Sequence, residues 1–258
     1  MLAALNHHVR DTRIRFLSAT HTYVVDGRKL DTSVTGFVKK NFKPFDADDA
    51  ISKMKRFGSF QQKYGSQTIE QVKRGWEENG DRARTLGTRL HAYIESFYNG
   101  EELPAAAEIT ELEVEIGYFY NFLRDHQHLI PYRSEWFIFD EQYQLAGCID
   151  MAYWIGPGKI ALYDWKRSKK IENSSRYGKG MGPLAYMDDC NLNHYSLQLN
   201  VYRRMIERNY GLEVTEMKLV ILHPDNSNYV VISVRKLCAE IDALFAQRAE
   251  QLLQCKTS

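Results

Sequence analysis

Apolar and polar positions in the N-terminal third of the chain follow two periods, one typical of strands and one typical of helices. Residues 14–31 contain two runs rich in β-branched and aromatic residues, with Asp26-Gly27 between them as a turn-forming pair. This pattern predicts a β-hairpin. Residues 32–42 predict a short helix. The stretch 46–79 is also predicted to be helical, and it is unusually polar because basic and aromatic residues are interleaved along it.

Two amphipathic helices follow, and then the pattern changes to short strands. The helices are predicted at residues 81–100 and 107–126, and a glycine closes the first of them. Three short β-rich runs separated by turn signals come next, at residues 132–139, 145–154 and 159–166. They predict a meander of three strands.

The C-terminal part of the chain alternates between helix and strand. A helix is predicted at residues 191–211, two strands at 216–224 and 228–234, and a last helix at 235–254. The order is therefore helices, three strands, a helix, two strands and a helix. It predicts an α/β or α+β domain built around one central mixed sheet flanked by helices.

Composition limits the class of protein. The chain has 258 residues, of which 44% are hydrophobic, and this is enough for one sizeable core. The 34 basic and 33 acidic residues nearly cancel. Because there is no global basic field, any site for a polyanion must be a local one.

Cysteine usage and hydropathy indicate a compartment. The widely spaced cysteines Cys148, Cys190, Cys238 and Cys255 include no C-x-x-C pair, which argues against a zinc finger and against a disulfide framework. No apolar run has the length of a signal peptide or a membrane span. We expect a soluble intracellular protein, located in the cytoplasm, the nucleoid, a mitochondrion or a virus-infected cell, that is not secreted and does not bind a membrane.

Two acids lie at symmetric positions in the predicted meander. If its last hairpin is centred on Pro157, Asp150 and Asp164 face each other across two strands. Directly opposed side chains have Cβ atoms roughly 5 Å apart, and like charges there are destabilising. A cation between the two carboxylates would relieve this repulsion, and Mg²⁺ or Mn²⁺ suits such oxygen ligands. Lys166 lies two residues after Asp164 and shares its face.

The alternative for these residues is a solvated strand end. An isolated D-x-K occurs by chance about once in a chain of this length, and the symmetry rests on an inferred turn. Two helices contribute further candidates. His91 and Glu95 are four residues apart and share a helical face, as do Gln198 and Tyr202. A lone helical histidine is more often structural than a ligand, and Tyr202 fits a core position equally well.

Taken together, five motifs resemble a known superfamily. In order along the chain they are "GTRLHAYIE", "SEWFIF", "AGCID", "YDWK" and "QLNVYR". They resemble the PD-(D/E)xK nucleases, and within them the RecB-like branch, which includes the mitochondrial genome maintenance exonuclease and viral and phage exonucleases. The resemblance covers residues 87–202. It implies a restriction-endonuclease-like core at residues 86–258, with an N-terminal hairpin and helical extension, residues 1–85, packed on that core.

The resemblance also implies roles for single residues. His91, Asp150, Asp164 and the main-chain carbonyl of Trp165 would bind Mg²⁺ or Mn²⁺, and Lys166 would be the catalytic lysine. The expected catalytic residues are His91, Asp150, Asp164 and Lys166. Some relatives carry clustered cysteines that hold an iron–sulphur cluster. The cysteines here do not resemble that pattern, so we expect no iron–sulphur cluster.

Other residues would have secondary roles by the same resemblance. Glu135 and Glu95 would support the active site. Gln198 and Tyr202 would contact the DNA backbone or steady the lysine.

A basic loop follows the predicted catalytic strand. It contains Arg167, Lys169, Lys170, Arg176 and Lys179. Such a run is often only a solvated loop, but its position after Lys166 favours contacts with phosphates. The basic and aromatic stretch at residues 53–76 could in turn stack on single-stranded bases, or it could be an ordinary amphipathic face.

The leading hypothesis is a metal-dependent DNA nuclease. Its expected partner is single-stranded DNA or DNA with free ends, on which it would act as an exonuclease in replication, recombination or repair. Two alternatives remain open, which are an RNA endonuclease and a non-catalytic nucleic-acid-binding module with the same fold.

Overall fold

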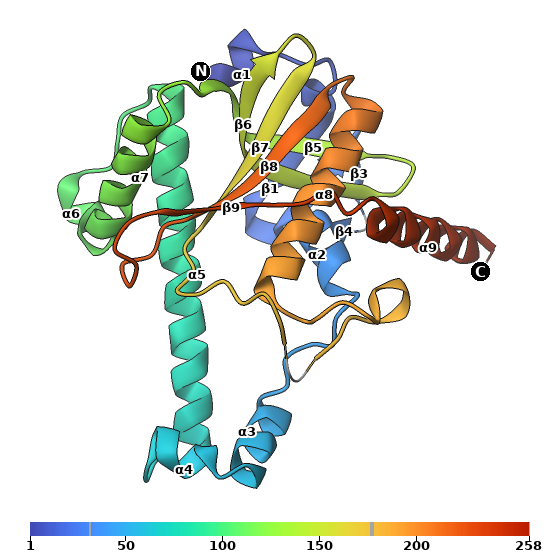
Figure 1. The fold of residues 1–258 in the computed structure, drawn as a ribbon. Coiled ribbons are helices and arrows are strands. Elements are labelled where there is room, and N and C mark those ends of the chain that lie inside the picture. The colour runs from blue at the N-terminus through green and yellow to red at the C-terminus, as the bar shows by residue number, and fades with distance from the viewer. Residues whose placement is uncertain (31, 176–177, 258) are drawn as a thin grey trace.

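The computed structural model describes residues 1–30, 32–175 and 178–257. One mixed sheet lies at the centre, with helices on both faces (Figure 1). This arrangement confirms the α/β fold class that the sequence predicts. Asp31 of the predicted hairpin and Arg176 of the basic loop lie outside the described residues.

The helices and strands follow the predicted order. The helices are α1 (Leu2–Leu5), α2 (Val34–Lys39), α3 (Ala47–Arg56), α4 (Ser59–Tyr64), α5 (Ile69–Asn99), α6 (Ala106–Ile109), α7 (Glu113–Asp125), α8 (Asn191–Asn209) and α9 (Cys238–Thr257). The strands are β1 (Ile14–Leu17), β2 (Thr22–Val25), β3 (Arg28–Lys29), β4 (Thr32–Ser33), β5 (Ile130–Asp140), β6 (Leu145–Gly156), β7 (Lys159–Lys166), β8 (Glu213–Ile221) and β9 (Val230–Ser233).

The main sheet has the strand order β4-β6-β7-β8-β9, and β5 also pairs with β6. Strands β5, β6 and β7 form the predicted antiparallel meander. Strand β8 runs parallel to β7. Parallel neighbours require a crossover connection, and α8 provides it.

The two faces of the sheet bury separate apolar clusters. On β7, Ile160 and Leu162 belong to the cluster formed with α2, α8 and α9, whereas Ala161 and Tyr163 belong to the cluster formed with α5 and α7. Figure 1 shows α8 across one face and α5 with α7 against the other. Because side chains alternate along a strand, Asp164 follows Ile160 and Leu162 toward α8.

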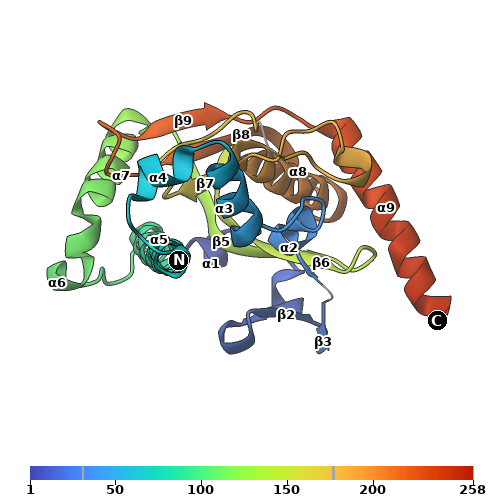
Figure 2. The same ribbon diagram turned by 90° about the horizontal axis from the view of Figure 1, so that it is seen from below.

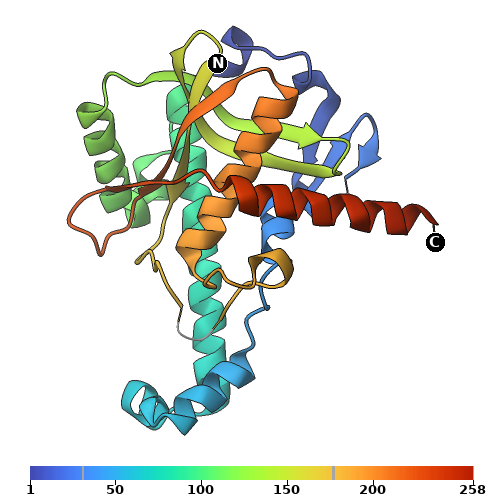
Figure 3. The same ribbon diagram turned by 45° about the vertical axis from the view of Figure 1, so that its right-hand side comes forward.

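The residues 46–79 are helical, as the sequence predicts, but they form α3, α4 and the start of α5. Gly58 and Gly65 separate these helices with φ angles of 70° and 57°, a region that side chains disfavour. Thr68 then caps α5 through a capping box with Gln71. Together, α3, α4 and the first turns of α5 form a helical projection (residues 46–80) that extends away from the sheet (Figure 3).

Helix α5 continues from this projection into the core without a break. The boundary that we predict between residues 85 and 86 lies inside this helix, and the division into two units stays a prediction. No helix in the described part of the chain combines the length and the hydropathy needed to cross a membrane.

The N-terminal hairpin forms a small second sheet, β1-β2-β3. The predicted turn at Asp26-Gly27 is present, with φ angles of 49° and 78°, and it joins β2 to β3, whereas a short turn at Ser18–Thr20 divides the first predicted run into β1 and β2. Ile14 and Val25 pack on Phe139 of the main sheet. Figure 2 shows β2 and β3 standing out from the main sheet beside β6.

Candidate metal centre

Two buried acids lie where the β6–β7 hairpin opens. Met151 of β6 pairs with Tyr163 of β7, so the next positions in this register are Asp150 and Asp164. The opposition of the two acids that the sequence predicts is thereby confirmed. Asp150 is 9% exposed and Asp164 is 2% exposed, and burying a charge is costly unless it has a partner.

Lys166 supplies a counter-charge to one of these acids. Its Nζ lies 2.6 Å from Oδ2 of Asp164, which confirms that the two side chains share a face. Burial raises the pKa of Asp164 to about 6, although Lys166 opposes this shift. Oδ1 of Asp164 is buried and has no hydrogen-bond partner among the described residues. Asp164 therefore has a counter-charge in Lys166 that does not depend on a metal ion.

His91 reaches the same place from α5. Its Nδ1 lies 3.4 Å from Oε1 of Glu135 and 3.6 Å from Oδ2 of Asp150. Its Nε2 lies 2.8 Å from the main-chain carbonyl oxygen of Trp165. Burial lowers the pKa of His91, but Asp150 and Glu135 outweigh it and raise this pKa to about 9. Both ring nitrogens face acceptors, so the imidazole is doubly protonated at neutral pH.

Three side chains could together hold a metal ion. These are His91, Glu135 and Asp150, whose ligand atoms all lie within 4.8 Å of one another. An imidazole with two carboxylates is a suitable donor set for Mn²⁺, and carboxylates also suit Mg²⁺. The set differs from the one that the resemblance implies, because Glu135 joins it while Asp164 pairs with Lys166.

Glu135 holds its position through an unusual backbone conformation. Its neighbours Ser134 and Trp136 pair with Met151 and Ile149 of β6, so Glu135 lies opposite Asp150. Its φ angle is 41°, which is uncommon for a residue other than glycine and rare within a strand. Such strain persists where surrounding contacts enforce it and is common at functional sites.

Cys148 contacts the second oxygen of the same carboxylate. Its Sγ donates to Oε2 of Glu135 at 3.0 Å, and burial raises the pKa of this thiol well above its usual value. The side chain of Cys148 therefore lines the site, a role that the sequence analysis does not assign to it. Its sequence position, one residue after Gly147 and two before Asp150, was the available signal.

Three further predicted residues, Glu95, Gln198 and Tyr202, lie close to this group. Glu95 is half-buried one helical turn after His91, and burial together with the charge of Glu135 raises its pKa. The amide of Gln198 donates to the hydroxyl of Tyr202 at 3.4 Å. Tyr202 is 3% exposed, and a contact of this side chain with a DNA backbone stays a prediction.

Tyr202 instead packs against Gly147 on β6. A Cβ atom at residue 147 would lie 2.6 Å from Cε1 of Tyr202, so only glycine lets the ring approach this closely. Gly147 and Tyr202 both belong to motifs that resemble the nucleases, and in the structure these two residues pack against each other.

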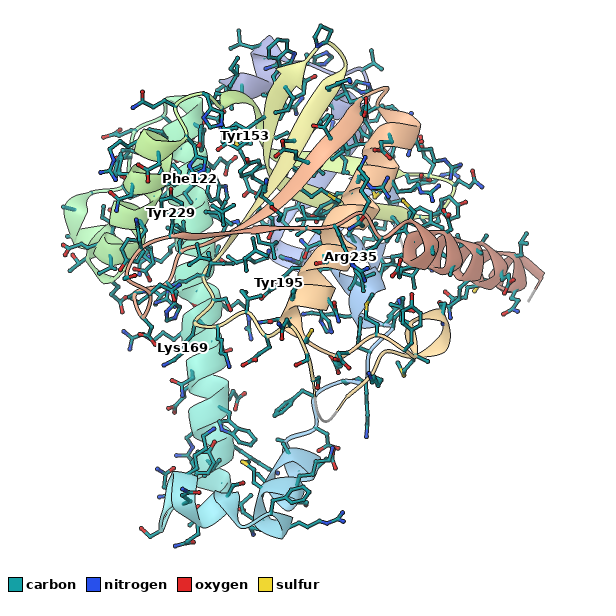
Figure 4. The ribbon with its side chains drawn as sticks, viewed as in Figure 1. Phe122, Tyr153, Lys169, Tyr195, Tyr229 and Arg235 are labelled. Carbon is teal, nitrogen blue, oxygen red and sulfur yellow. The ribbon has the colours of Figure 1, made fainter. Side chains whose placement is uncertain are left out.

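The basic loop is less free than the sequence indicates. Arg167 is bound to buried Glu115 at 2.7 Å. Lys169 and Lys170 are exposed and form surface ion pairs with Asp225 and Glu172. Figure 4 labels Lys169 on the segment that leaves β7, and Tyr195 on α8.

A cleft of about 740 Å³ opens over these groups. Its lining includes His91, Glu135, Cys148, Lys166, Arg167 and Tyr195. Tyr195 is a residue that sequence reasoning missed, and Nζ of Lys166 lies 4.9 Å from the centre of its ring. Its place one helical turn before Leu199 gave it no signal other than that of core packing.

A second cavity of about 670 Å³ lies on the helical projection. Aromatic and basic side chains contribute to its lining, among them Phe45, Phe57, Trp76, Lys53 and Lys63. Part of this lining comes from the stretch in which the sequence interleaves basic and aromatic residues, and part comes from residues 43–46 and from Ser175, Gly178, Lys179 and Asp189 between β7 and α8.

Comparison with known proteins gives only distant likeness. No family model and no curated protein matches the chain. Among solved structures, a protein named SSO0001 is 13% identical, with 86% of this chain and 75% of that chain covered and a TM-score of 0.33. A "Putative exonuclease" from Eubacterium rectale is 11% identical, with 86% and 78% covered and a TM-score of 0.41. At these TM-scores neither likeness bears on the site.

Proposed function

We propose that this protein is a metal-dependent nuclease that hydrolyses phosphodiester bonds in DNA. One observation carries the proposal, which is the meeting of His91, Glu135 and Asp150 beside the buried Asp164–Lys166 pair. The motifs that resemble the RecB-like branch of the PD-(D/E)xK nucleases lie on the elements that bring these residues together.

Each residue would have a distinct task. His91, Glu135 and Asp150 would hold Mg²⁺ or Mn²⁺, and the bound ion would supply Lewis acidity and an activated water. Asp164 raises the pKa of Lys166, which keeps the ammonium charged. Lys166 would therefore stabilise negative charge on the reacting phosphate rather than act as a base.

The helical projection supports a single-stranded substrate. Its cavity combines exposed rings such as Phe45 and Phe57 with Lys53 and Lys63. Aromatic side chains stack on unpaired bases, whereas an intact duplex offers no free base faces. We propose an exonuclease on single strands or DNA ends, with a task in replication, recombination or repair.

The first experiment is a cleavage assay with three labelled substrates. Purified protein with Mn²⁺ is incubated with single-stranded DNA, duplex DNA and RNA, and Asp150→Asn serves as the matched inactive variant. We expect cleavage of single-stranded DNA that chelation abolishes and that the variant lacks. Cleavage of RNA alone would make the protein an RNA endonuclease, and binding without any cleavage would make it a non-catalytic module.

A further inference from the structure

Arg167 and Glu115 form a buried ion pair beside the metal centre. Nε of Arg167 lies 2.7 Å from Oε1 of Glu115, and the two side chains are 12% and 1% exposed. Glu115 belongs to α7, on the face of the sheet opposite to α8. A carboxylate buried to this degree is strongly unfavourable without a partner, so it holds the guanidinium firmly in place.

The ion pair uses only one of the three guanidinium nitrogens of Arg167. Its Nε donates to Glu115, and its two terminal nitrogens have no hydrogen-bond partner within the described residues. They are not among the buried atoms without a partner, and Arg167 lines the cleft together with Lys166. The terminal N–H groups are therefore accessible from the cleft.

We propose that Arg167 forms a phosphate subsite next to the reacting phosphate. The inference rests on the proposed function and adds a contact that the metal centre does not need. Lys166 pairs with Asp164 toward α8 and Arg167 pairs with Glu115 toward α7. The two consecutive cations thus diverge at the end of β7, so Arg167 would meet a different phosphate from the one at Lys166.

A fixed guanidinium suits this role better than the neighbouring lysines do. Its planar N–H groups match two oxygens of one phosphate, and little rotamer freedom is lost on binding when the side chain is already held. Lys169 and Lys170 are 76% and 72% exposed and end in surface ion pairs. They contribute charge but no fixed position.

The alternative is that Arg167 only neutralises Glu115. A binding experiment without metal separates the two roles, because it does not depend on cleavage. Affinity for a fluorescent oligothymidylate is measured in EDTA over a range of salt concentrations. The test variant is Glu115→Gln with Arg167→Gln, which removes both charges together. Arg167→Lys keeps a charge beside Glu115 but lacks the planar fork, and Arg124→Gln on α7 is the control for charge.

We expect both Arg167 variants to bind about 10-fold more weakly than the wild type and the control. The double variant should also lose about 0.7 from the slope of log affinity against log salt, the value for one phosphate of a single strand. Wild-type affinity in both variants would overturn the subsite, whatever the outcome of the cleavage assay. Loss of binding in a protein that never cleaves would support the subsite and refute the nuclease.

Oligonucleotides with one neutral methylphosphonate linkage locate the phosphate. One linkage should weaken binding to the wild type and have no further effect in the double variant, because both changes remove the same contact. Additive losses at every linkage would contradict the subsite. A matched oligonucleotide with and without a 5′-phosphate shows whether the group is a terminal phosphate or an internal diester.

Discussion

The Nε2 atom of His91 lies 2.8 Å from the main-chain carbonyl oxygen of Trp165. By resemblance both groups would be ligands of one metal, yet here the imidazole donates a hydrogen bond to the carbonyl. The other ring nitrogen faces Glu135 and Asp150. A proton on His91 therefore holds the acids together, and a metal that uses this histidine must displace that proton.

Metal binding should release a proton. The pKa of His91 is about 9, and only the neutral imidazole can bind a metal. The affinity for Mn²⁺ should rise about tenfold per pH unit from pH 7 to 9 and level off above. Calorimetry at pH 7 in two buffers of different ionisation enthalpy should report about one proton released per ion. Binding without proton release would show that His91 is not a ligand, and His91→Asn should release none.

Glu135 should matter to the metal as much as Asp150 does. If it is a ligand, Glu135→Gln should weaken Mn²⁺ binding about 100-fold or more, since even partners behind a ligand contribute 10- to 100-fold. Cys148→Ser is the matched comparison, because it alters only the donor to the other carboxylate oxygen. Calorimetry with each variant provides the measurement. A loss for Glu135→Gln no larger than that for Cys148→Ser would return Glu135 to a supporting role.

The alternation of side chains made much of the fold predictable from the sequence. The run at residues 159–166 coincides with β7, and its turn symmetry placed Asp150 opposite Asp164. The breaks between the helices of the projection could not be predicted in this way. The positive φ of Gly58 belongs to the folded backbone, and the spacing of apolar residues along the sequence does not reveal it.

The site was predictable only where strand parity or helix spacing determines it. Lys166 follows from parity with Asp164. The contact between Cys148 and Glu135 joins two strands, and it depends on the left-handed φ of Glu135. The pair Arg167–Glu115 joins two residues that are 52 positions apart in the sequence. No local pattern encodes contacts of these kinds.

Replacing Lys166 should reduce both activity and stability. Lys166→Ala removes the charge at the phosphate and leaves Asp164 buried without its counter-charge, a loss of at most about 2 kcal/mol at pH 7.5, which is about 1.5 pH units above the folded-state pKa of Asp164. The folded-state pKa of Asp164 is about 6, above its unfolded value, so its ionisation already lowers stability as pH rises through 6. Without Lys166 this pKa should rise further, and the loss of stability on ionisation should be larger.

Urea unfolding at pH 5 and at pH 7.5 tests whether Lys166→Ala loses stability when Asp164 ionises. The variant should be close to the wild type at pH 5, where Asp164 is neutral, and weaker at pH 7.5. Adding Asp164→Asn should restore most of the lost stability without restoring cleavage. A deficit that is equal at both pH values would show that the ion pair is not its cause.

Gly147→Ala should destabilise the fold through Tyr202. The added methyl would lie 2.6 Å from the ring, and overpacking of this kind costs about 2 kcal/mol. In the background of Tyr202→Leu the same change should cost at least about 1 kcal/mol less, because the ring is gone. Gly117→Ala on α7 is the control, since open space surrounds that position and a helical alanine should stabilise by about 0.5 kcal/mol. Additive losses at residues 147 and 202 would contradict the contact.

Cleavage should require a free end of a single strand. The cleft over the candidate metal site and the cavity on the helical projection both present aromatic and basic side chains, and unpaired bases fit them better than a rigid duplex does. A linear single strand should therefore be cut faster than blunt duplex. If the protein is the exonuclease that we propose, the linear strand should also be cut faster than a circle of the same sequence. Blocking each end in turn gives the polarity of cleavage.

Phe57→Ala should slow single-strand cleavage, because this ring is 66% exposed in the cavity. Tyr120→Ala, which removes an exposed ring on α7, should not slow it. Equal rates on circle and line would make the protein an endonuclease, and faster cutting of blunt duplex would refute the preference for single strands.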